Sequence, residues 1–357
     1  MSLRDEILEQ PEAARRQLVS STGAIEALVG RLRSDPVNSV VIAARGTSDH
    51  AAIYGQYLFG VANGYSVGLA APSIVSVYGV EPRFGRSLVI GISQSGASPD
   101  IVGVVAAARR QGAPTLAITN APDSPLGAAA EFVIDLAAGP ELAIAATKTY
   151  STSLLAIARL SVALAEAPSN AAPEAHALDA GADAAALQMS PEWIQAALGL
   201  EPQIEALAAE VAAADRCVIV GRGFEYATAR EWALKLKELG QLFADPYSAA
   251  DFLHGPIALV QPGIPAFVVA PEGRAAAGLG DLLVGLRERG VDTLVVSDSA
   301  ATRALGRWSV ALPAGVPEWL RPVVSIIPAQ LFAYHLTRAR GLDPDQPRYI
   351  SKVTRTT

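Results

Sequence analysis

Residues 91–100 read Gly-Ile-Ser-Gln-Ser-Gly-Ala-Ser-Pro-Asp and follow the apolar run 87–90. The pattern predicts a strand, then a turn rich in hydroxyl groups, then a helix with Ser98 as its N-cap and Pro99 as its first residue. A helix N-terminus offers unpaired N–H groups and the positive end of a dipole, and both suit a phosphate. Three serines add hydroxyl donors and the stretch contains no cation. A phosphate monoester on a small molecule therefore fits better than a nucleoside triphosphate with its metal.

The composition favours a soluble two-domain protein. The chain has 357 residues, of which 51% are apolar and 18% charged, so a large core is expected and disorder is not. The net charge is −7 without a basic cluster, which argues against nucleic acid as a partner. No apolar run reaches the roughly 18–20 residues that span a bilayer, and the N-terminus lacks an apolar signal core. We therefore expect no membrane association and a cytoplasmic location.

The residues give no sign of a metal or a redox cofactor. The single cysteine, Cys217, lies in an apolar run and is expected to be a buried, inert thiol. The four histidines are scattered without metal-ligand spacing. The stretch 221–226 approaches the dinucleotide fingerprint, but Tyr226 stands where the third glycine belongs, which argues against a nicotinamide cofactor. We expect neither cofactor nor metal.

The two halves of the chain repeat one pattern. Similar stretches recur at an offset of 177 or 178 residues, namely 40–46 and 218–223, 112–119 and 290–297, and 140–141 and 317–318. A constant offset across three separate stretches indicates a tandem duplication. Near-continuously apolar runs at 39–44, 87–92, 114–119 and 131–136 alternate with segments of helical length. Such strands are buried on both faces, so each copy is predicted to be a parallel sheet with helices on both sides.

The predicted organisation follows from this repeat. We expect an N-terminal helix within residues 1–20 (the pattern covers 4–19), a first domain at 21–168, a linker at 169–195, a second domain at 196–342 and a tail at 343–357. The tail contains Pro344 and Pro347, so it cannot be one long helix. The second copy lacks the hydroxyl loop, because residues 269–273 read Val-Ala-Pro-Glu-Gly. Glu272 would repel a phosphate there, which assigns the anion site to the first copy alone.

A second hydroxyl-bearing turn follows the first predicted strand, at Gly46-Thr47-Ser48. Parallel sheets bind ligands at the carboxyl ends of their strands. The turns at 46–48 and 93–98 are therefore expected to converge at one edge of the first sheet.

Chemistry in the second copy centres on a helix predicted between Gly223 and Gly240, where Glu231, Lys235 and Glu238 share one face. This arrangement is compatible with a solvated, salt-bridged stripe. The alternative is a carboxylate poised for proton transfer beside an ammonium that favours its charged form. His254 precedes Gly255-Pro256 in a predicted turn. Either a structural role or acid–base catalysis of sugar-ring opening would suit this histidine.

These residues together resemble a known family. The motifs are Gly46-Thr47-Ser48, Ser93-Gln94-Ser95-Gly96-x-Ser98-x-Asp100, Glu141-x4-Ala146-Thr147-Lys148, Glu231-x-Ala-Leu-Lys-Leu-Lys-Glu238, His254-Gly255-Pro256 and Lys352-Val353-Thr354. They resemble the double sugar-isomerase (SIS) domain proteins, in particular the isomerase half of glucosamine-6-phosphate synthase and the stand-alone SIS-type glucosamine-6-phosphate deaminases. The resemblance covers about residues 20–357 and implies two flavodoxin-like domains, usually in a homodimer.

The resemblance also implies roles for matching positions. The hexose or hexosamine 6-phosphate would be bound by Thr47, Ser48, Ser93, Gln94, Ser95 and Ser98, with Ile144, Ala145 and Ser351 lining the sugar site. Glu238 would move the proton between C1 and C2, and His254 would assist ring opening, typically reaching the neighbouring subunit's site. Lys235 and Lys352 would act near the carbonyl, and Lys352 corresponds to the family's tail lysine that can form an imine.

The chain departs from the synthase in two ways. It begins Met1-Ser2 without an N-terminal cysteine nucleophile, and its tail ends Thr354-Arg355-Thr356-Thr357 without the usual acidic residues, which bears on the placement of Lys352. The expected activity is conversion of glucosamine 6-phosphate to fructose 6-phosphate and ammonia. A galactosamine-6-phosphate deaminase/isomerase, a deglycase of sugar–amine adducts and an ammonia-using synthase remain open. So does a non-catalytic sugar-phosphate sensor, although the short N-terminal segment leaves no room for a DNA-binding helix-turn-helix.

Overall fold

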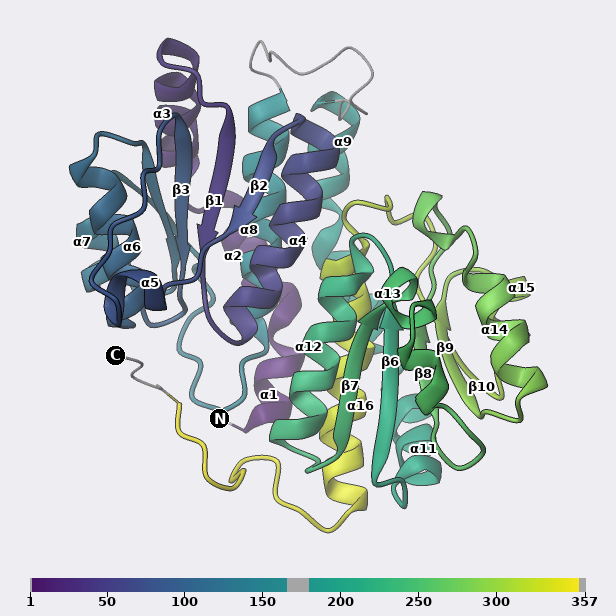
Figure 1. Ribbon diagram of the computed structural model, residues 1–357. Coiled ribbons are helices and arrows are strands. Elements are labelled where there is room, and N and C mark those ends of the chain that lie inside the picture. The colour runs from purple at the N-terminus through teal and green to yellow at the C-terminus, as the bar shows by residue number, and fades with distance from the viewer. Residues whose placement is uncertain (1, 166–179, 353–357) are drawn as a thin grey trace. The chain divides into compact units, whose positions relative to one another are not determined.

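The computed structural model describes residues 2–165 and 180–352 and divides into two compact units. Of the described residues, the first unit comprises 12–141, 148–165 and 180–189. The second unit comprises 2–11, 142–147 and 190–352. Each unit is built on one five-stranded sheet (Figure 1). The first described residues of the chain and the short segment 142–147 both belong to the second unit.

The first sheet is parallel throughout and has the strand order β2-β1-β3-β4-β5. Its strands are β1 (Ser39–Ala43), β2 (Ser66–Leu69), β3 (Ser87–Ile92), β4 (Thr115–Thr119) and β5 (Phe132–Asp135). In register, Ile42 of β1 pairs with Ile90 of β3, which pairs with Leu116 of β4. Every residue of β3 and β4 is buried, as the continuous apolar runs predicted.

The second sheet is also parallel, with the order β10-β9-β8-β6-β7. Its strands are β6 (Arg216–Gly221), β7 (Phe243–Ser248), β8 (Ala266–Val269), β9 (Thr293–Ser297) and β10 (Trp308–Ala311). Starting from β7, the neighbour order repeats that of the first sheet starting from β2, with β8 in the place of β3. The prediction of a duplicated α/β domain with helices on both faces of a parallel sheet is confirmed.

In the first sheet, sequence patterning placed β1, β3, β4 and β5 within one residue at each end, and it indicated no strand at β2 or at β7. Both are edge strands. β2 has only four residues, none of them buried, and β7 contains Pro246. An edge strand is exposed on one side and can include a proline, so it lacks the apolar run by which a buried strand is recognised.

Helices cover both faces of each sheet (Figure 1). Those of the first unit are α2 (Gln10–Val19), α3 (Thr22–Ser34), α4 (Thr47–Asn63), α5 (Ser73–Ser76), α6 (Pro99–Arg110), α7 (Pro125–Ala129), α8 (Lys148–Ala165) and α9 (Ala180–Gln188). Those of the second unit are α1 (Leu3–Leu8), α10 (Ser190–Leu198), α11 (Glu201–Val211), α12 (Glu225–Glu238), α13 (Ala249–Leu253), α14 (Leu279–Glu288), α15 (Ala300–Arg303) and α16 (Arg321–Ala339), with short 3-10 helices at Pro256–Leu259 and Arg274–Ala276. Among the residues that the structure describes, no helix is both long and apolar enough to cross a bilayer.

The single helix predicted over residues 4–19 is two helices, α1 and α2, separated at Glu9. Pro11 explains the break. It has no N–H with which to reach the carbonyl of Ile7, and its ring would clash with that carbonyl in a continuous helix. The side chain of Gln10 supplies the missing donor, because its Nε2 lies 3.0 Å from the Ile7 oxygen.

The ends of the predicted domains fall partly outside the described residues. Of the predicted linker 169–195, residues 169–179 lie outside them, and the rest includes α9 and the start of α10. The tail runs without a helix from Gly341 to Lys352, as its prolines predicted. Val353 and Thr354 of the tail motif lie outside the described residues.

Candidate functional site

The turn after β3 has the predicted geometry. Ser98 is the N-cap of α6 and Pro99 is its first residue. The Ser98 side chain makes no capping hydrogen bond to the helix, so its hydroxyl is not used by the backbone that it precedes. Within the described residues, the amides of Ser95 and Ser98 donate to no other backbone group. The turn therefore presents hydroxyls and amides together at a helix N-terminus, which is the arrangement that binds a phosphate.

Gly96 gives this turn its shape. Its φ is +61°, and a Cβ at this position would lie only 1.9 Å from the Ser124 Oγ. The Gly96 amide donates to the Ser93 carbonyl and to the Ser93 Oγ, each at 3.2 Å, and its carbonyl accepts from the Leu126 amide at 3.0 Å. The turn is therefore packed against the start of α7 and admits only glycine at its centre.

The substitution Gly96→Ala should weaken the binding of inorganic phosphate by about tenfold or more, an affinity loss of about 1.4 kcal/mol. The added methyl group must displace Ser124 and reopen the turn, while the αL backbone costs alanine about 1–2 kcal/mol more. Titration calorimetry of both proteins with phosphate would measure the change.

Gly112→Ala is the matched control. Gly112 also has a positive φ, +80°, but a Cβ there would meet nothing within 4 Å. This variant should lose some stability through the backbone alone and keep its phosphate affinity. Equal phosphate affinity in the wild type and Gly96→Ala would contradict the role of the turn.

The turn after β1 lies at the same edge of the first sheet, as predicted. β1 and β3 are parallel neighbours, and α4 begins at Thr47 directly after the N-cap Gly46. An ion pair joins the two turns, since the Arg45 Nε lies 2.9 Å from the Oδ2 of Asp100, a carboxylate that is 1% exposed. The predicted phosphate-binding residues Thr47, Ser48, Ser93, Gln94, Ser95 and Ser98 therefore all belong to two adjoining turns of the first unit.

Sequence reasoning missed Arg45. The stretch 91–100 contains no cation, but the fold brings the half-exposed guanidinium of Arg45 to the first turn of α6. Two features of the sequence could have indicated this arginine. Arg45 directly precedes Gly46-Thr47-Ser48, and the motif that begins at Ser93 ends in an acidic residue, Asp100.

In the second unit, Glu231, Lys235 and Glu238 lie on one face of α12, as their spacing predicted. The Lys235 Nζ is 3.2 Å from Glu231 Oε1 and 2.6 Å from Glu238 Oε2. The hypothesis of a solvated stripe is wrong, because Glu231 is 0% exposed, Lys235 1% and Glu238 24%. α12 packs against β6, β7 and α16, and this packing buries the face that an isolated helix would leave in water.

The aromatic core holds α12 in place. Trp232 stacks on Phe267 of β8, with ring centroids 5.1 Å apart, and meets Phe332 of α16 edge-on at 5.5 Å. Lys235 lies three residues after Trp232, so the packing of the indole holds the helix turn that carries the lysine. Burial by itself would lower the pKa of the Lys235 ammonium, but the charges and hydrogen bonds of Glu231 and Glu238 outweigh it and raise that pKa. Lys235 is therefore a permanent cation that orients the Glu238 carboxylate.

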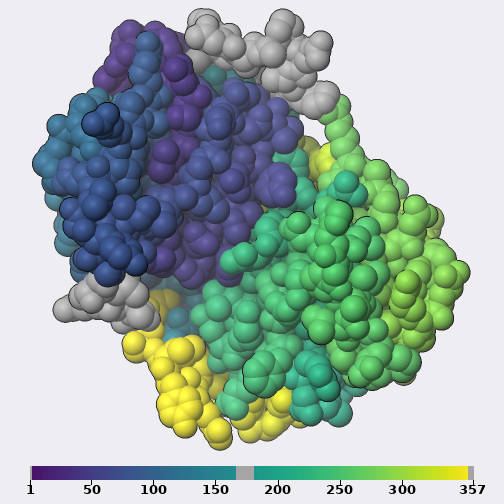
Figure 2. All heavy atoms as spheres, viewed as in Figure 1, coloured from purple at the N-terminus to yellow at the C-terminus, as the bar shows by residue number. Residues whose placement is uncertain are grey.

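Glu238 borders a pocket of about 510 Å³ that also reaches the tail. Its lining consists of Lys237, Glu238, Gln241, Leu242, Phe243, Arg348, Tyr349 and Ile350. Figure 2 shows the tail in yellow at the surface of the second unit, beside the atoms in green. Glu238, which is partly exposed, thus has open space beside its carboxylate. The same pocket is lined by Ile350, which directly precedes the tail residues Ser351 and Lys352.

The tail lysine is anchored to the segment that carries two predicted sugar-lining residues. The Lys352 Nζ donates to the Ala143 carbonyl at 2.6 Å. The backbone amides of the same segment are also bound. The buried carboxylate of Glu6 accepts hydrogen bonds from the N–H of Leu142 and, at 3.2 Å, from the N–H of Ala143. Segment 142–147, in which Ile144 is half-buried and Ala145 buried, is therefore held by α1 and by the tail. Ser351 is exposed.

His254 is exposed at the C-cap of α13, in the turn that was predicted for it. The next residue, Gly255, has a φ of +139°. Phe252, two residues earlier, packs in the core of its own unit, whereas Leu253 is 55% exposed. Cys217 is buried in β6, and burial raises the pKa of its thiol. Over the described ranges, no group of three or more His, Cys, Asp or Glu side chains could hold a metal ion.

The comparison with protein families fits this architecture. The model of the SIS domain matches residues 36–163 and 210–339. The chain belongs to the SIS-domain family. Both copies of the repeat are matched, and each match contains one complete five-stranded sheet.

Relatives of this SIS-domain protein include glutamine–fructose-6-phosphate aminotransferases (isomerizing). The protein from Gloeobacter violaceus is 35% identical over 355 residues, covering 97% of this chain and 57% of that protein. The one from Acidithiobacillus ferridurans is 36% identical over 328 residues, covering 88% of this chain and 51% of that protein. The chain thus spans between about half and three fifths of the length of such relatives.

Solved structures share the two-domain fold. One from Silicibacter pomeroyi, described as a candidate phosphosugar isomerase, is 33% identical with a TM-score of 0.83, covering 97% of this chain and 100% of that one. The C-terminal domain of glucosamine-fructose-6-phosphate aminotransferase from Francisella tularensis is 26% identical with a TM-score of 0.85, covering 96% and 98%. A glucosamine-6-phosphate deaminase from Thermotoga maritima is 21% identical with a TM-score of 0.73, covering 100% of both chains, a likeness that concerns the fold alone.

Proposed function

We propose that this protein is a phosphosugar isomerase that acts on hexosamine 6-phosphates, converting glucosamine 6-phosphate to fructose 6-phosphate and ammonia. The observation that carries the proposal is the Glu238 carboxylate, held at 2.6 Å by a buried ammonium and bordering a pocket, in a chain that belongs to the SIS-domain family. A carboxylate in a fixed orientation with open space beside it suits proton transfer at carbon.

Substrate binding is assigned to the first unit. The phosphate ester would accept hydrogen bonds from the hydroxyls of Ser93, Ser95 and Ser98 and from the amides at the start of α6. Thr47 and Ser48 would add hydroxyl donors from the adjoining turn, and the Gln94 side chain would add an amide. Arg45 would add positive charge at the same edge, although Asp100 partly neutralises it.

Proton transfer is assigned to the second unit. Once the sugar ring is open, Glu238 would take the proton from C2 and return it to C1, which converts the aldehyde and the C2 amine into a C1 alcohol and a C2 imine. Lys235 would act as a positioning residue, because both of its carboxylate partners hold its ammonium in the interior. Lys352 would act at the carbonyl, and Ile144, Ala145 and Ser351 would line the sugar.

The nitrogen leaves by hydrolysis. Water adds to the C2 imine, the C–N bond breaks, and the products are the C2 ketone and ammonia, so that one water is consumed for each ammonia released. His254 would transfer the proton for ring opening. Its exposed position on α13 is compatible with action at the site of a second subunit in a homodimer.

A second candidate is the same isomerisation in the direction of synthesis. The relatives quoted above carry the name glutamine–fructose-6-phosphate aminotransferase, which favours addition of nitrogen to fructose 6-phosphate followed by ketose-to-aldose conversion. Both directions use the proton transfer between C1 and C2 that we assign to Glu238.

The test is a panel of hexosamine 6-phosphates differing at C4, assayed for ammonia release and for ketose phosphate, together with fructose 6-phosphate plus ammonium assayed for amino sugar. We expect stoichiometric ammonia and fructose 6-phosphate from glucosamine 6-phosphate. Turnover of galactosamine 6-phosphate alone would reassign the C4 epimer, and net amino-sugar formation alone would favour the second candidate. Binding of the sugar phosphates without turnover in any reaction would contradict the proposal and favour a sensor.

A further inference from the structure

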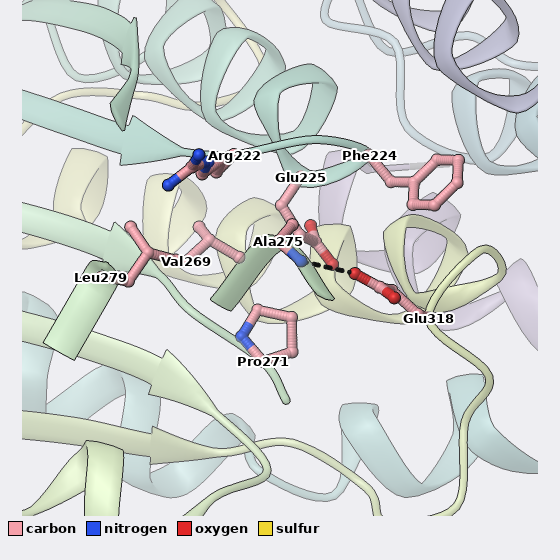
Figure 3. A pocket seen from close by; sticks show the side chains of 8 residues that line it. All are labelled: Arg222, Phe224, Glu225, Val269, Pro271, Ala275, Leu279 and Glu318. Atoms are coloured by element: carbon pink, nitrogen blue, oxygen red, sulfur yellow. Dashed lines mark hydrogen bonds between the residues drawn. The ribbon is translucent and has the colours of Figure 1, made fainter. Parts of the chain in front are cut away.

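The turn after β8 is the counterpart of the phosphate turn after β3. β8 lies between β6 and β9, as β3 lies between β1 and β4. A small pocket adjoins this turn and is lined by Arg222, Phe224, Glu225, Val269, Pro271, Ala275, Leu279 and Glu318. Figure 3 shows Glu225 approaching it from α12 and Glu318 from the segment before α16, with the Glu318 carboxylate bonded to the backbone of Ala275.

Carboxylates occupy backbone amides of this turn. Glu318 Oε1 accepts from the Ala275 amide at 2.9 Å. The same carboxyl group lies against Gly273, where a Cβ would come within 2.4 Å of the Glu318 Cδ and where φ is +147°. Asp298 Oδ1 accepts from the Glu272 amide at 2.8 Å. The backbone of the turn therefore still binds negatively charged oxygens, although its side chains carry none of the serines of the first copy.

The first copy uses the matching glutamate elsewhere. Glu141 lies 177 residues before Glu318, at the offset of the repeat. It accepts hydrogen bonds from the Thr149 amide at 3.1 Å and from the Thr149 Oγ1 at 2.8 Å, in the first turn of α8. The same position of the repeat thus binds a helix N-terminus in one copy and the anion turn in the other.

The pocket beside Glu318 is almost filled. Its free volume of about 10 Å³ is at the lower limit of the space that holds one water molecule. Glu225 Oε2 accepts from Thr228 Oγ1 at 2.5 Å and from Ser325 Oγ at 2.7 Å, but among the described residues its buried Oε1 has no partner. Glu225 is 4% exposed, and burial raises the pKa of its carboxyl. An unsatisfied buried oxygen that lines a pocket indicates a place where a polar molecule is still accommodated.

We propose that the second copy retains an anion-binding turn whose resident ligand is the Glu318 carboxylate, and that this internal ligand excludes phosphate from a second site. From the sequence, we attributed the exclusion of phosphate from the second copy to Glu272, whose side chain is exposed. The geometry assigns it to Glu318, which is 46 residues away in the sequence and accepts directly from the Ala275 amide. Removing this carboxylate opens a site for a small oxyanion such as inorganic phosphate.

The test counts inorganic phosphate sites per chain by titration calorimetry, in the wild type and in Glu318→Ala, and locates them in crystals of both proteins grown with phosphate. We expect one additional site in Glu318→Ala, with a phosphate oxygen at the Ala275 amide. Glu272→Ala is the matched control, since it removes one negative charge from the same turn without vacating an amide. Glu318→Gln should also gain no site, because its amide oxygen can still accept from Ala275.

This inference rests on the proposed function, because it compares the second copy with the phosphate turn of the first. The number of phosphate sites per chain separates the failure of one from the failure of the other. A wild type that binds no phosphate at residues 93–98 would contradict the proposed function. The inference would then still be tested by whether Glu318→Ala has one phosphate site more than the wild type. No added site in Glu318→Ala, or an added site in Glu272→Ala, would overturn the inference. If Glu318→Ala is insoluble, Glu318→Ser vacates the same amide and is expected to give the same count.

Discussion

Replacing Glu238 with glutamine is expected to lower kcat for conversion of glucosamine 6-phosphate by about 10²–10⁴-fold, the usual contribution of a general acid–base group. Glutamine has nearly the same shape and can still accept a hydrogen bond from Lys235, but it cannot take a proton from carbon. Binding of the phosphate should change little, because the hydroxyl-rich turn belongs to a different part of the fold. Steady-state kinetics and phosphate titration would separate the two effects.

A change in kcat could also arise from loss of the contact with Lys235. The melting temperature of Glu238→Gln therefore needs to be measured beside its kinetics. Glu288→Gln removes one negative charge from an exposed position near the end of α14 and serves as the control for net charge. It should retain wild-type kcat. Full turnover by Glu238→Gln would show that another group carries the proton between C1 and C2.

Replacing Lys235 with methionine is expected to destabilise the fold by about 3–5 kcal/mol, the range for removing one member of a buried ion pair. Methionine fills a similar volume, but it removes the ammonium that lies 3.2 Å from the Glu231 carboxylate, which is 0% exposed. Glu238, which is 24% exposed, can still be solvated in part. The cost therefore falls mainly on Glu231. Urea denaturation followed by circular dichroism would measure the apparent free energy of unfolding.

Two further variants test this explanation. Lys237→Met changes an exposed lysine on the same helix and should stay within about 0.5 kcal/mol of the wild type. The double variant Glu231→Gln with Lys235→Met removes the buried charge as well as its partner, so it should recover part of the lost stability. A double variant less stable than Lys235→Met alone would mean that packing, and not the loss of the ion pair between Lys235 and Glu231, determines the effect.

Local residue types predicted much of the hydroxyl-rich turn after β3. The change from an apolar run to Ser-x-Ser-Gly and then Ser98-Pro99 predicted a strand, a turn and a helix start, and the structure has each at that place. The constant offset between the two halves predicted the duplication that both sheets show. Such features depend on neighbours in the chain, where backbone preferences and hydrophobic periodicity act directly.

The sequence by itself thus determined the repeated α/β architecture, the central strands and the helix that carries Glu231, Lys235 and Glu238. The tertiary structure alone decided that this helical face is buried, that Arg45 meets Asp100, and that Glu318 occupies the turn after β8. The reason is physical. Secondary structure reflects short-range sterics and hydrogen bonding. The solvation and partners of a charged side chain depend instead on segments tens of residues away that only folding brings into contact.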